Sequence, residues 1–205
     1  MELLASALPK EEHVIYDFTD RDDLPAPTPW KVHGRRLVYD SPWVSIELVD
    51  VDPGSDKRYE HHVVRLPYQA VCVVVQHFVK GILLLYRHRF ITDTAGFELP
   101  AGGIGQGESA VEAARREVLE ETGWSIADPT VFMEANASDG VTDQRFIFVY
   151  ARALRESAPP LDAYESQRLY WVPAQQIPNL VRRGLVPSCS AMFGLLYAQQ
   201  FGFIE

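Results

Sequence analysis

The hydrophobic and polar positions of the chain change period along its length, and each change marks an expected element. Residues 44–48 alternate between apolar and polar side chains, which is typical of a strand with one buried face. Residues 52–55 (Asp-Pro-Gly-Ser) are a turn signal, and residues 59–66 read as the returning strand. The pattern therefore predicts an antiparallel β-subdomain that begins near Arg36.

The first part of the chain lacks such a period. Residues 1–34 contain an acidic stretch and a proline-rich stretch, so we expect an irregular arm along the surface. We therefore divide the chain into an N-terminal arm and β-subdomain, residues 1–66, and a second domain, residues 67–205.

The second domain begins with two apolar segments, residues 70–76 and 81–86. The first is apolar without alternation, as expected for a strand that is covered on both faces. Further strands are expected near residues 130–135, 145–153 and 168–172.

Three helices are expected in the same domain. Ser109 followed by Glu112 is a capping-box pattern, and Gly123 is a natural end for the helix that starts there. Two shorter helices are expected near residues 174–183 and 188–200. The order of strands, one central helix, strands and a terminal helix favours the α/β class, as an α/β sandwich around a mixed sheet.

Composition narrows the possible partners. The formal net charge of −9, without a local basic patch, argues against a nucleic-acid partner. The longest apolar run, about residues 70–75, is too short to span a bilayer, and the N-terminus does not resemble a signal peptide. Only two cysteines occur, Cys72 and Cys189. We therefore expect no membrane partner, no disulfide framework and a cytoplasmic location.

The chemistry is concentrated in the expected central helix. Residues three and four apart share one face of a helix, so Glu117, Glu120 and Glu121 project together beside Arg116. Hard cations such as Mg²⁺ prefer oxygen ligands of this kind and often join carboxylates to substrate phosphates. The preceding residues 99–103 (Leu-Pro-Ala-Gly-Gly) form a tight loop whose backbone can approach an ion closely.

A solvated helix face is the competing interpretation. Glu112–Arg116 and Arg116–Glu120 are ordinary i,i+4 pairs, and the helix considered alone favours that interpretation. The spacing of the whole segment, residues 102–124, changes the balance.

That segment resembles the Nudix box at every defining position. Gly102 is followed after five residues by Glu108 and after seven more by residues 116–124, Arg-Glu-Val-Leu-Glu-Glu-Thr-Gly-Trp. A looser resemblance covers most of residues 36–172. The resemblance implies a Nudix-like α/β/α fold and hydrolysis of a nucleoside diphosphate joined to a group X, which gives a nucleoside monophosphate and a phosphorylated X.

The resemblance also implies residue roles. The main ligands of Mg²⁺, with Mn²⁺ as a possible substitute, would be Glu117 and Glu121. Glu120 would be a further ligand or a bridge through water, and the Ala101 carbonyl another oxygen ligand. Arg116 would orient the glutamates, and Glu108 would anchor the loop or help a second metal.

Other features resemble the ADP-ribose and nucleotide-sugar pyrophosphatases, which have an extra β-subdomain and form homodimers. By this resemblance the substrate-binding residues are Arg87, Arg89 and Glu98; the alternative for each arginine is a surface position at a strand end. The loop of residues 137–143 lacks the proline that ADP-ribose hydrolases usually carry there, which puts ADP-ribose itself in doubt.

The resemblance further suggests a loop glutamate that acts as catalytic base or ligand. Glu165, just before the strand expected at residue 168, is the candidate, and Asp162 or Asp143 are alternatives. The four tryptophans are expected in the core, although one may stack on a nucleobase.

We therefore expect a Nudix hydrolase of the ADP-ribose or nucleotide-sugar type that acts on a nucleoside diphosphate derivative. The alternatives are a dinucleotide or CoA-type pyrophosphatase, or a non-catalytic nucleotide-sensing domain. The intact set of glutamates favours an enzyme over a sensor.

Overall fold

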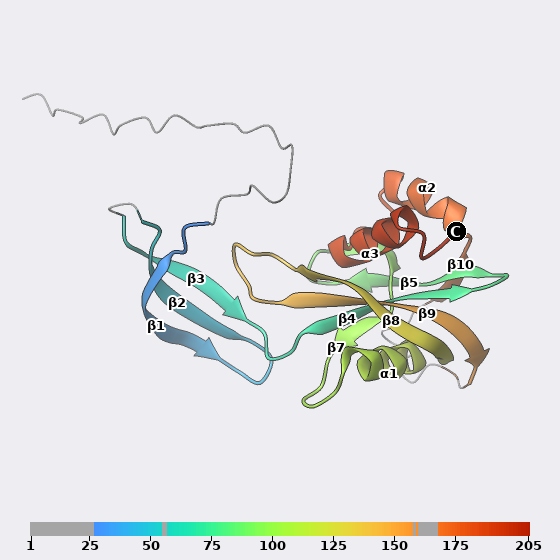
Figure 1. The fold of residues 1–205 in the computed structure, drawn as a ribbon, viewed down its shortest axis with the longest axis horizontal. Helices are drawn as coiled ribbons and strands as arrows, with labels where there is room; N and C mark the ends of the chain where they lie inside the picture. Colours follow the sequence, from blue (N-terminus) through green and yellow to red (C-terminus); the bar gives the residue numbers. More distant parts are fainter. Residues whose placement is uncertain (1–26, 55–56, 158, 160–167) are drawn as a thin grey trace, which may run out of the picture.

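The chain forms two β-sheets joined by a short connection. The computed structural model describes residues 27–54, 57–157, 159 and 168–205. The N-terminal sheet is antiparallel and has the order β1-β2-β3, with strands β1 (Lys31–Asp40), β2 (Ser45–Asp52) and β3 (Tyr59–Arg65) (Figure 1). It lies beside the larger body of the molecule, as the expected β-subdomain.

The larger sheet is mixed. Its main path runs β10-β5-β4-β9-β8, while β6 pairs with β5 and β7 pairs with β4. The parallel pair is β4 with β9, and the other pairs are antiparallel. The strands are β4 (Ala70–His77), β5 (Gly81–Arg89), β6 (Thr94–Glu98), β7 (Ala101–Gly103), β8 (Trp124–Asn136), β9 (Arg145–Glu156) and β10 (Arg168–Val172).

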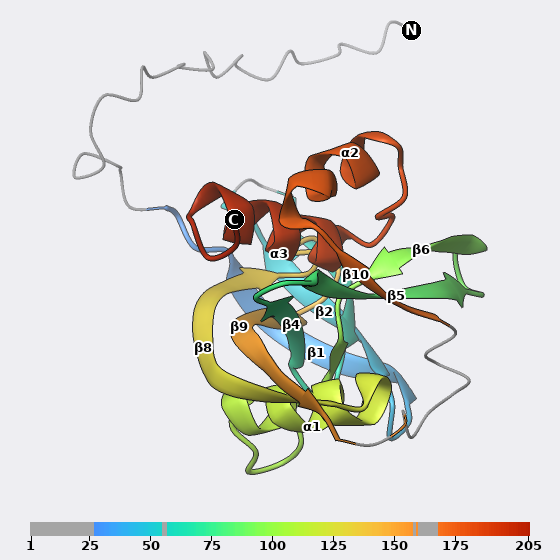
Figure 2. The ribbon, with the colours of Figure 1, turned by 90° about the vertical axis from the view of Figure 1, so that its right-hand side faces the viewer.

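Helices cover both faces of this sheet. Helix α1 (Ala110–Thr122) lies on one face, and α2 (Ile177–Arg182) and α3 (Cys189–Gln200) lie on the other (Figures 1 and 2). A 3₁₀ turn, Ala174–Gln176, precedes α2. The expected α/β/α sandwich around a mixed sheet is confirmed.

The sequence of strand β4 is apolar without alternation because both of its faces lie in a hydrophobic core. Val71, Val73 and Val75 belong to the core under α1, whereas Cys72 and Val74 belong to the core under α2 and α3. Successive side chains of a strand point to opposite faces, and here both faces are covered by helices. The expectation of a strand buried on both faces is confirmed.

Helix α1 begins and ends as the sequence predicts. The Ser109 side chain accepts the Glu112 amide, and the Glu112 side chain accepts the Ser109 amide, which completes the capping box. Gly123 takes a left-handed conformation with φ of 73° and donates its amide to the Leu119 carbonyl at 2.9 Å. The helix that carries the glutamates therefore has fixed ends.

Several sequence-based boundaries are wrong. Strand β1 starts at Lys31, so the irregular arm cannot extend to residue 34, because Lys31 and Val32 pair with Asp52 and Val51. Strand β8 starts at Trp124, directly after α1, whereas the sequence predicted a strand near residues 130–135. Strand β7 occupies part of the segment that was expected to be a loop, because Gly102 and Gly103 pair with β4. This pairing uses backbone groups alone, so no pattern of side chains in the sequence indicates it.

The two sheets meet at the loop between β8 and β9. Arg65 Nη1 lies 3.0 Å from Asp143 Oδ2, and the Val64 amide donates to the Val141 carbonyl at 2.8 Å. His61 Nε2 lies 2.8 Å from the Gly140 carbonyl oxygen. The expected boundary at residue 66 falls between the sheets, and their status as separate domains stays a prediction.

The tryptophans divide between the two sheets. Trp124 is buried and Trp171 packs against the core under α1, as expected. Trp30 and Trp43 are exposed, Trp43 at 81%, so placing them in the core was wrong. Both belong to the N-terminal part, where none of the described helices covers the sheet. Within the described residues, no helix is both long and apolar enough to cross a membrane.

Candidate active site

The three glutamates of α1 that are expected to bind metal, Glu117, Glu120 and Glu121, differ in their surroundings. The Glu117 and Glu121 side chains are 12% and 5% exposed, whereas that of Glu120 is 41% exposed. Glu117 and Glu121 are four residues apart and lie against the β7 loop, because an i,i+4 pair shares one helix face. Two of the three carboxylates are therefore held inside the site, and Glu120 lies at its rim.

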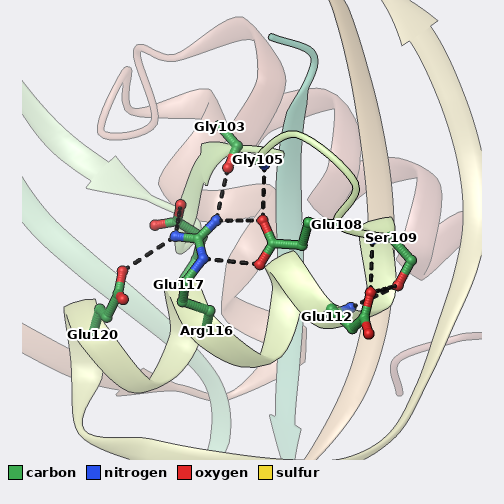
Figure 3. Close-up of polar contacts among 8 residues, drawn as sticks. All are labelled: Gly103, Gly105, Glu108, Ser109, Glu112, Arg116, Glu117 and Glu120. Atoms are coloured by element: carbon green, nitrogen blue, oxygen red, sulfur yellow. Dashed lines mark hydrogen bonds and ion pairs between the residues drawn. The ribbon is translucent and has the colours of Figure 1, made fainter.

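Arg116 connects the glutamates with the loop (Figure 3). Its Nε and Nη2 atoms bind both oxygens of Glu108 at 2.9 and 2.8 Å, and Nη2 also donates to the Gly103 carbonyl at 2.8 Å. Its Nη1 donates to Glu117 at 2.6 Å and to Glu120 at 3.2 Å. These contacts fit the expectation that Arg116 orients the glutamates.

Glu108 anchors the loop before α1. It accepts the Gly105 amide at 2.8 Å in addition to the Arg116 guanidinium. The Arg116 contact first, and the Gly105 amide second, hold the pKa of Glu108 below its usual value. The carboxylate therefore stays ionised and ties the glycine-rich loop to the helix, as expected for the loop-anchoring role.

Glu121 is fixed through both of its oxygens. Its Oε1 accepts from Arg87 Nη2 at 2.8 Å, and its Oε2 accepts from the Ala101 amide at 2.9 Å. Burial raises the pKa of Glu121, and the charge of Arg87 opposes that rise. The carboxylate thus has a defined orientation beside the loop.

Glu117 is packed against a glycine. A Cβ added to Gly102 would lie 2.0 Å from Glu117 Oε1, so only glycine fits there without displacing the carboxylate. Burial raises the pKa of Glu117, although Arg116 opposes the effect. The loop and the carboxylate are therefore in direct contact. This contact gives a steric reason why the motif has glycine at position 102.

The donor set fits a hard divalent cation. Glu117, Glu120, Glu121 and the backbone oxygens of the loop supply the oxygen ligands that Mg²⁺ prefers. Among the described residues, no three His, Cys, Asp or Glu side chains are gathered closely enough to form a ready metal site. The three carboxylates instead contact arginines, Glu117 and Glu120 through Arg116 and Glu121 through Arg87.

A cavity of about 870 Å³ adjoins the loop. Arg89 is on its wall with a side chain 51% exposed, and Glu98 holds the Arg89 guanidinium at 3.0 and 2.6 Å. Other lining residues are Trp43, Tyr68, Gln69, Ala101, Gly102, Gly103, Gln144, Ser188, Cys189 and Ser190. The volume is in the range of ordinary small-molecule sites.

The two arginines of β5 have different environments. Arg89 reaches the cavity, as expected for a residue that meets substrate, whereas Arg87 is 4% exposed and contacts Glu121 and Glu98. Arg87 is therefore not a surface arginine at a strand end, which was the alternative to a role in substrate binding. It is also not among the described residues of the cavity wall. Its contacts include one carboxylate of α1, Glu121, and one of β6, Glu98.

Of the three candidate loop carboxylates, Asp143 is the one within the described residues. Glu165 and Asp162 lie outside the described residues. Asp143 is engaged by Arg65 at the junction of the two sheets. The role of catalytic base therefore stays a prediction for Glu165.

Sequence reasoning missed part of the cavity wall. Trp43 comes from the turn before β2, and Ser188 to Ser190 come from the start of α3. Neither segment carries a local motif, because tertiary packing alone brings them next to β7. From the sequence we could propose only that one of the four tryptophans stacks on a nucleobase, without saying which one.

Comparison with known proteins assigns a family to the part of the chain that carries these glutamates and the loop. Residues 66–188 match the NUDIX domain. A CMP-5'-(N-acetyl-N-hydroxy-3-aminopropyl)phosphonate hydrolase of Streptomyces rubellomurinus is 32% identical, over 82% of this chain and 81% of that protein. An RNA pyrophosphohydrolase of Bartonella clarridgeiae is 29% identical, over 48% of this chain and 69% of that protein.

A solved structure shares the fold. The crystal structure of an ADP compounds hydrolase superimposes with a TM-score of 0.74 at 19% identity, and the match covers 87% of this chain and 96% of that one. At this identity the likeness shows the fold alone. Together with the domain match over most of the chain and the relative at 32% identity, these findings show that the chain belongs to the NUDIX domain family and is a Nudix hydrolase, a diphosphatase.

Proposed function

We propose that the chain hydrolyses the diphosphate bond of a nucleoside diphosphate derivative such as ADP-ribose or a nucleotide sugar. The products are a nucleoside monophosphate and a phosphorylated X group. The observation that carries the proposal is the contact between the inward carboxylates, Glu117 and Glu121, and a loop that also lines the cavity containing Arg89.

Mg²⁺, or Mn²⁺ in its place, is the proposed cofactor. Glu117 and Glu121 would hold it, with Glu120 as a further ligand or a bridge through water and the Ala101 carbonyl as another oxygen. When bound, the metal polarises a phosphoryl oxygen and lowers the pKa of a water. Arg116 keeps the carboxylates in position, and Glu165 is the proposed base that takes the proton from the attacking water.

Arg89 binds the diphosphate in this proposal. Its half-exposed guanidinium faces the cavity, and a planar fork of donors suits phosphate oxygens. Glu98 is only 10% exposed and accepts three hydrogen bonds from Arg89. Glu98 therefore acts through Arg89, by holding the guanidinium where it reaches substrate.

Trp43 is the proposed platform for the nucleobase. The turn that carries it is fixed by Ser41, whose hydroxyl oxygen accepts the Trp43 and Val44 amides at 3.3 and 3.1 Å. An exposed indole on a rigid turn at a cavity rim offers a flat apolar face at little cost in side-chain entropy. Replacing Trp43 with alanine raises KM more than it lowers kcat if this role is right.

A related substrate is the second candidate. The relative at 32% identity is named for hydrolysing a CMP-phosphonate, in which a nucleoside monophosphate is joined to a phosphonate. Cleavage of such a link needs the same carboxylates and arginine. A dinucleotide, a CoA derivative or loss of catalysis in a nucleotide sensor remain alternatives that one substrate panel separates.

A homodimer built partly through residues 36–66 completes the proposal. Strand β1 is an edge strand, and Leu37, Val38 and Tyr39 on it are exposed. A three-stranded sheet with apolar side chains left in water gains stability when a second copy covers it.

Activity and metal dependence test the function directly. Purified protein is incubated with Mg²⁺ or Mn²⁺ and a panel of ADP-ribose, nucleotide sugars, CMP-phosphonates, dinucleotides and CoA, and the monophosphate released is measured by chromatography. We expect Glu117→Gln and Glu121→Gln to lower kcat by at least about 100-fold, since each removes a metal-ligand charge.

The matched control is Glu134→Gln, which removes an exposed glutamate of β8 that pairs with Arg145 of β9 and does not line the cavity. It should keep wild-type turnover. If no substrate of the panel gives a monophosphate with either metal, the catalytic proposal fails and the sensor alternative gains. If Glu117→Gln turns over at the wild-type rate, Glu117 takes no part in the reaction and its contacts serve the fold alone.

A further inference from the structure

Arg87 is a buried cation that the motif does not account for. It lies on β5 four residues after Leu83, whose side chain belongs to the core under α1, so Arg87 points to the same side of the sheet. Its Nη2 atom donates to Glu121 Oε1 at 2.8 Å, and its Nε atom lies 3.5 Å from Glu98 Oε2. The guanidinium therefore bridges two carboxylates inside the protein.

The bridge belongs to a line of alternating charges. Arg89, at the cavity, binds Glu98; Glu98 lies next to Arg87; and Arg87 binds Glu121 on α1. Glu121 in turn accepts the Ala101 amide of the loop. The line thus joins the proposed diphosphate contact on β5 to the proposed metal ligand on α1.

Stability alone is a weak reason for such a bridge. Removing two charges from water costs about as much as their attraction returns, so a buried ion pair gains little over apolar side chains of similar volume. A buried pair does fix orientation, because the guanidinium fork and the backbone amide each bind one oxygen of Glu121. Each carboxylate oxygen keeps further lone-pair capacity for another partner.

We infer that Arg87 is a positioning residue for the metal site: it holds the Glu121 carboxylate in the orientation in which Glu121 binds the divalent cation. This inference rests on the proposed metal role of Glu121 and gives Arg87 a task other than substrate contact. Arg87 is not among the described residues that line the cavity, and its contact with Glu121 is the route by which we infer it acts.

Mn²⁺ binding without substrate tests the inference. The free Mn²⁺ signal in electron paramagnetic resonance gives the dissociation constant for wild type, Arg87→Met, Arg87→Lys and Glu121→Gln. Loss of a residue that orients a metal ligand typically weakens metal affinity by about 10–100-fold, and we expect that range for Arg87→Met. Arg87→Lys keeps the charge without the planar fork, so its affinity should lie between those of wild type and Arg87→Met.

A double variant separates positioning from a general loss of structure. If Arg87 acts through Glu121, Arg87→Met combined with Glu121→Gln binds Mn²⁺ no more weakly than Glu121→Gln alone. Additive losses would overturn the inference. Arg115→Met is the matched control, because Arg115 on α1 donates to the Ile126 carbonyl and should leave Mn²⁺ affinity unchanged.

The outcomes distinguish the inference from the function beneath it. Wild-type Mn²⁺ affinity in Glu121→Gln overturns the metal role of Glu121 and the inference with it. Weak binding by Glu121→Gln together with wild-type binding by Arg87→Met overturns the inference alone. If Arg87→Met does not fold, Arg87→Lys decides, and wild-type affinity in that variant overturns the inference.

Discussion

At the scale of single residues, the site depends on contacts of individual atoms rather than on charge alone. Glu117 has room for its carboxylate only because Gly102 has no side chain, and Glu121 is oriented by one guanidinium and one amide. Glu120, at the rim, lacks such packing. Glu117, Glu120 and Glu121 therefore have unequal surroundings, with the two buried carboxylates closest to the loop.

Gly102→Ala should impair the site while leaving most of the fold in place. The added Cβ would lie 2.0 Å from Glu117 Oε1, and the flexible end of Glu117 has to move away. We expect kcat to fall by about 10-fold or more, as for other losses of ligand orientation. Gly103→Ala is the control, because its Cβ meets only Tyr68 Cβ at 3.8 Å, and it should have a much smaller effect in the same assay.

The loop base is tested by comparing three carboxylates. Glu165→Gln should lower kcat at saturating substrate by about 100-fold or more, the usual contribution of a positioned general base. Asp162→Asn and Asp143→Asn are measured beside it. Asp143 pairs with Arg65, so its loss should affect the junction of the sheets more than turnover. If Asp162→Asn or Asp143→Asn collapses while Glu165→Gln does not, the role belongs to that aspartate.

At the scale of elements, α1 is defined by its caps. Ser109 and Glu112 exchange hydrogen bonds at the start of the helix, and Gly123 ends it with a positive φ. The helix carries Arg116 and all three glutamates, so a fixed start and end place the carboxylates against β7. Local sequence is sufficient for this, because caps involve neighbours within four residues.

Ser109→Ala should destabilise the protein by about 1 kcal/mol and lower Tm by a few degrees, since it removes an N-cap. Thermal unfolding followed by circular dichroism measures the change. Loss of more than about 3 kcal/mol, or no loss at all, would contradict the cap as described.

The same cap predicts a pH dependence. The hydrogen bonds from Ser109, the side chain first and the backbone second, lower the pKa of Glu112 from its ordinary value of 4.5. A lowered acid pKa stabilises the fold above 4.5, and the contribution is lost as pH falls through the folded-state pKa. The stability difference between wild type and Ser109→Ala should therefore shrink below pH 4.5. A difference that is constant from pH 7 to pH 3 would show that Glu112 takes no part.

At the scale of the whole molecule, the N-terminal sheet stands beside the catalytic body and contacts it through the β8–β9 loop (Figure 1). Its Trp43 nevertheless lines the cavity. The cavity wall thus combines the N-terminal sheet, the NUDIX core and the start of α3.

Sedimentation velocity at micromolar concentration tests the proposed homodimer. Wild type should sediment as a dimer, and Val38→Lys should shift it toward monomer, because a charge on the exposed edge strand opposes association. Leu154→Lys is the control: Leu154 is similarly exposed on β9, outside residues 36–66, and should leave the dimer intact. A wild-type protein that is monomeric at this concentration would contradict the proposal.

The sequence by itself determined the elements and groups that depend on near neighbours. The capping box and end of α1, the shared face of its glutamates and the double burial of β4 all follow from spacing within a few residues. Dihedral preferences, caps and helix periodicity are local, so these features could be predicted from short segments. The chemistry was predicted from the resemblance of residues 102–124 to the Nudix box.

The residues and strands that these groups contact depend on tertiary packing, not on neighbours in the sequence. Arg87 and Glu121 are 34 residues apart, and the parallel pair β4–β9 joins segments still further apart. The exposed Trp43 reaches the cavity in the same way. Such pairings depend on which packing of the whole chain buries the most apolar surface with its polar groups satisfied, and no local pattern in the sequence encodes that balance.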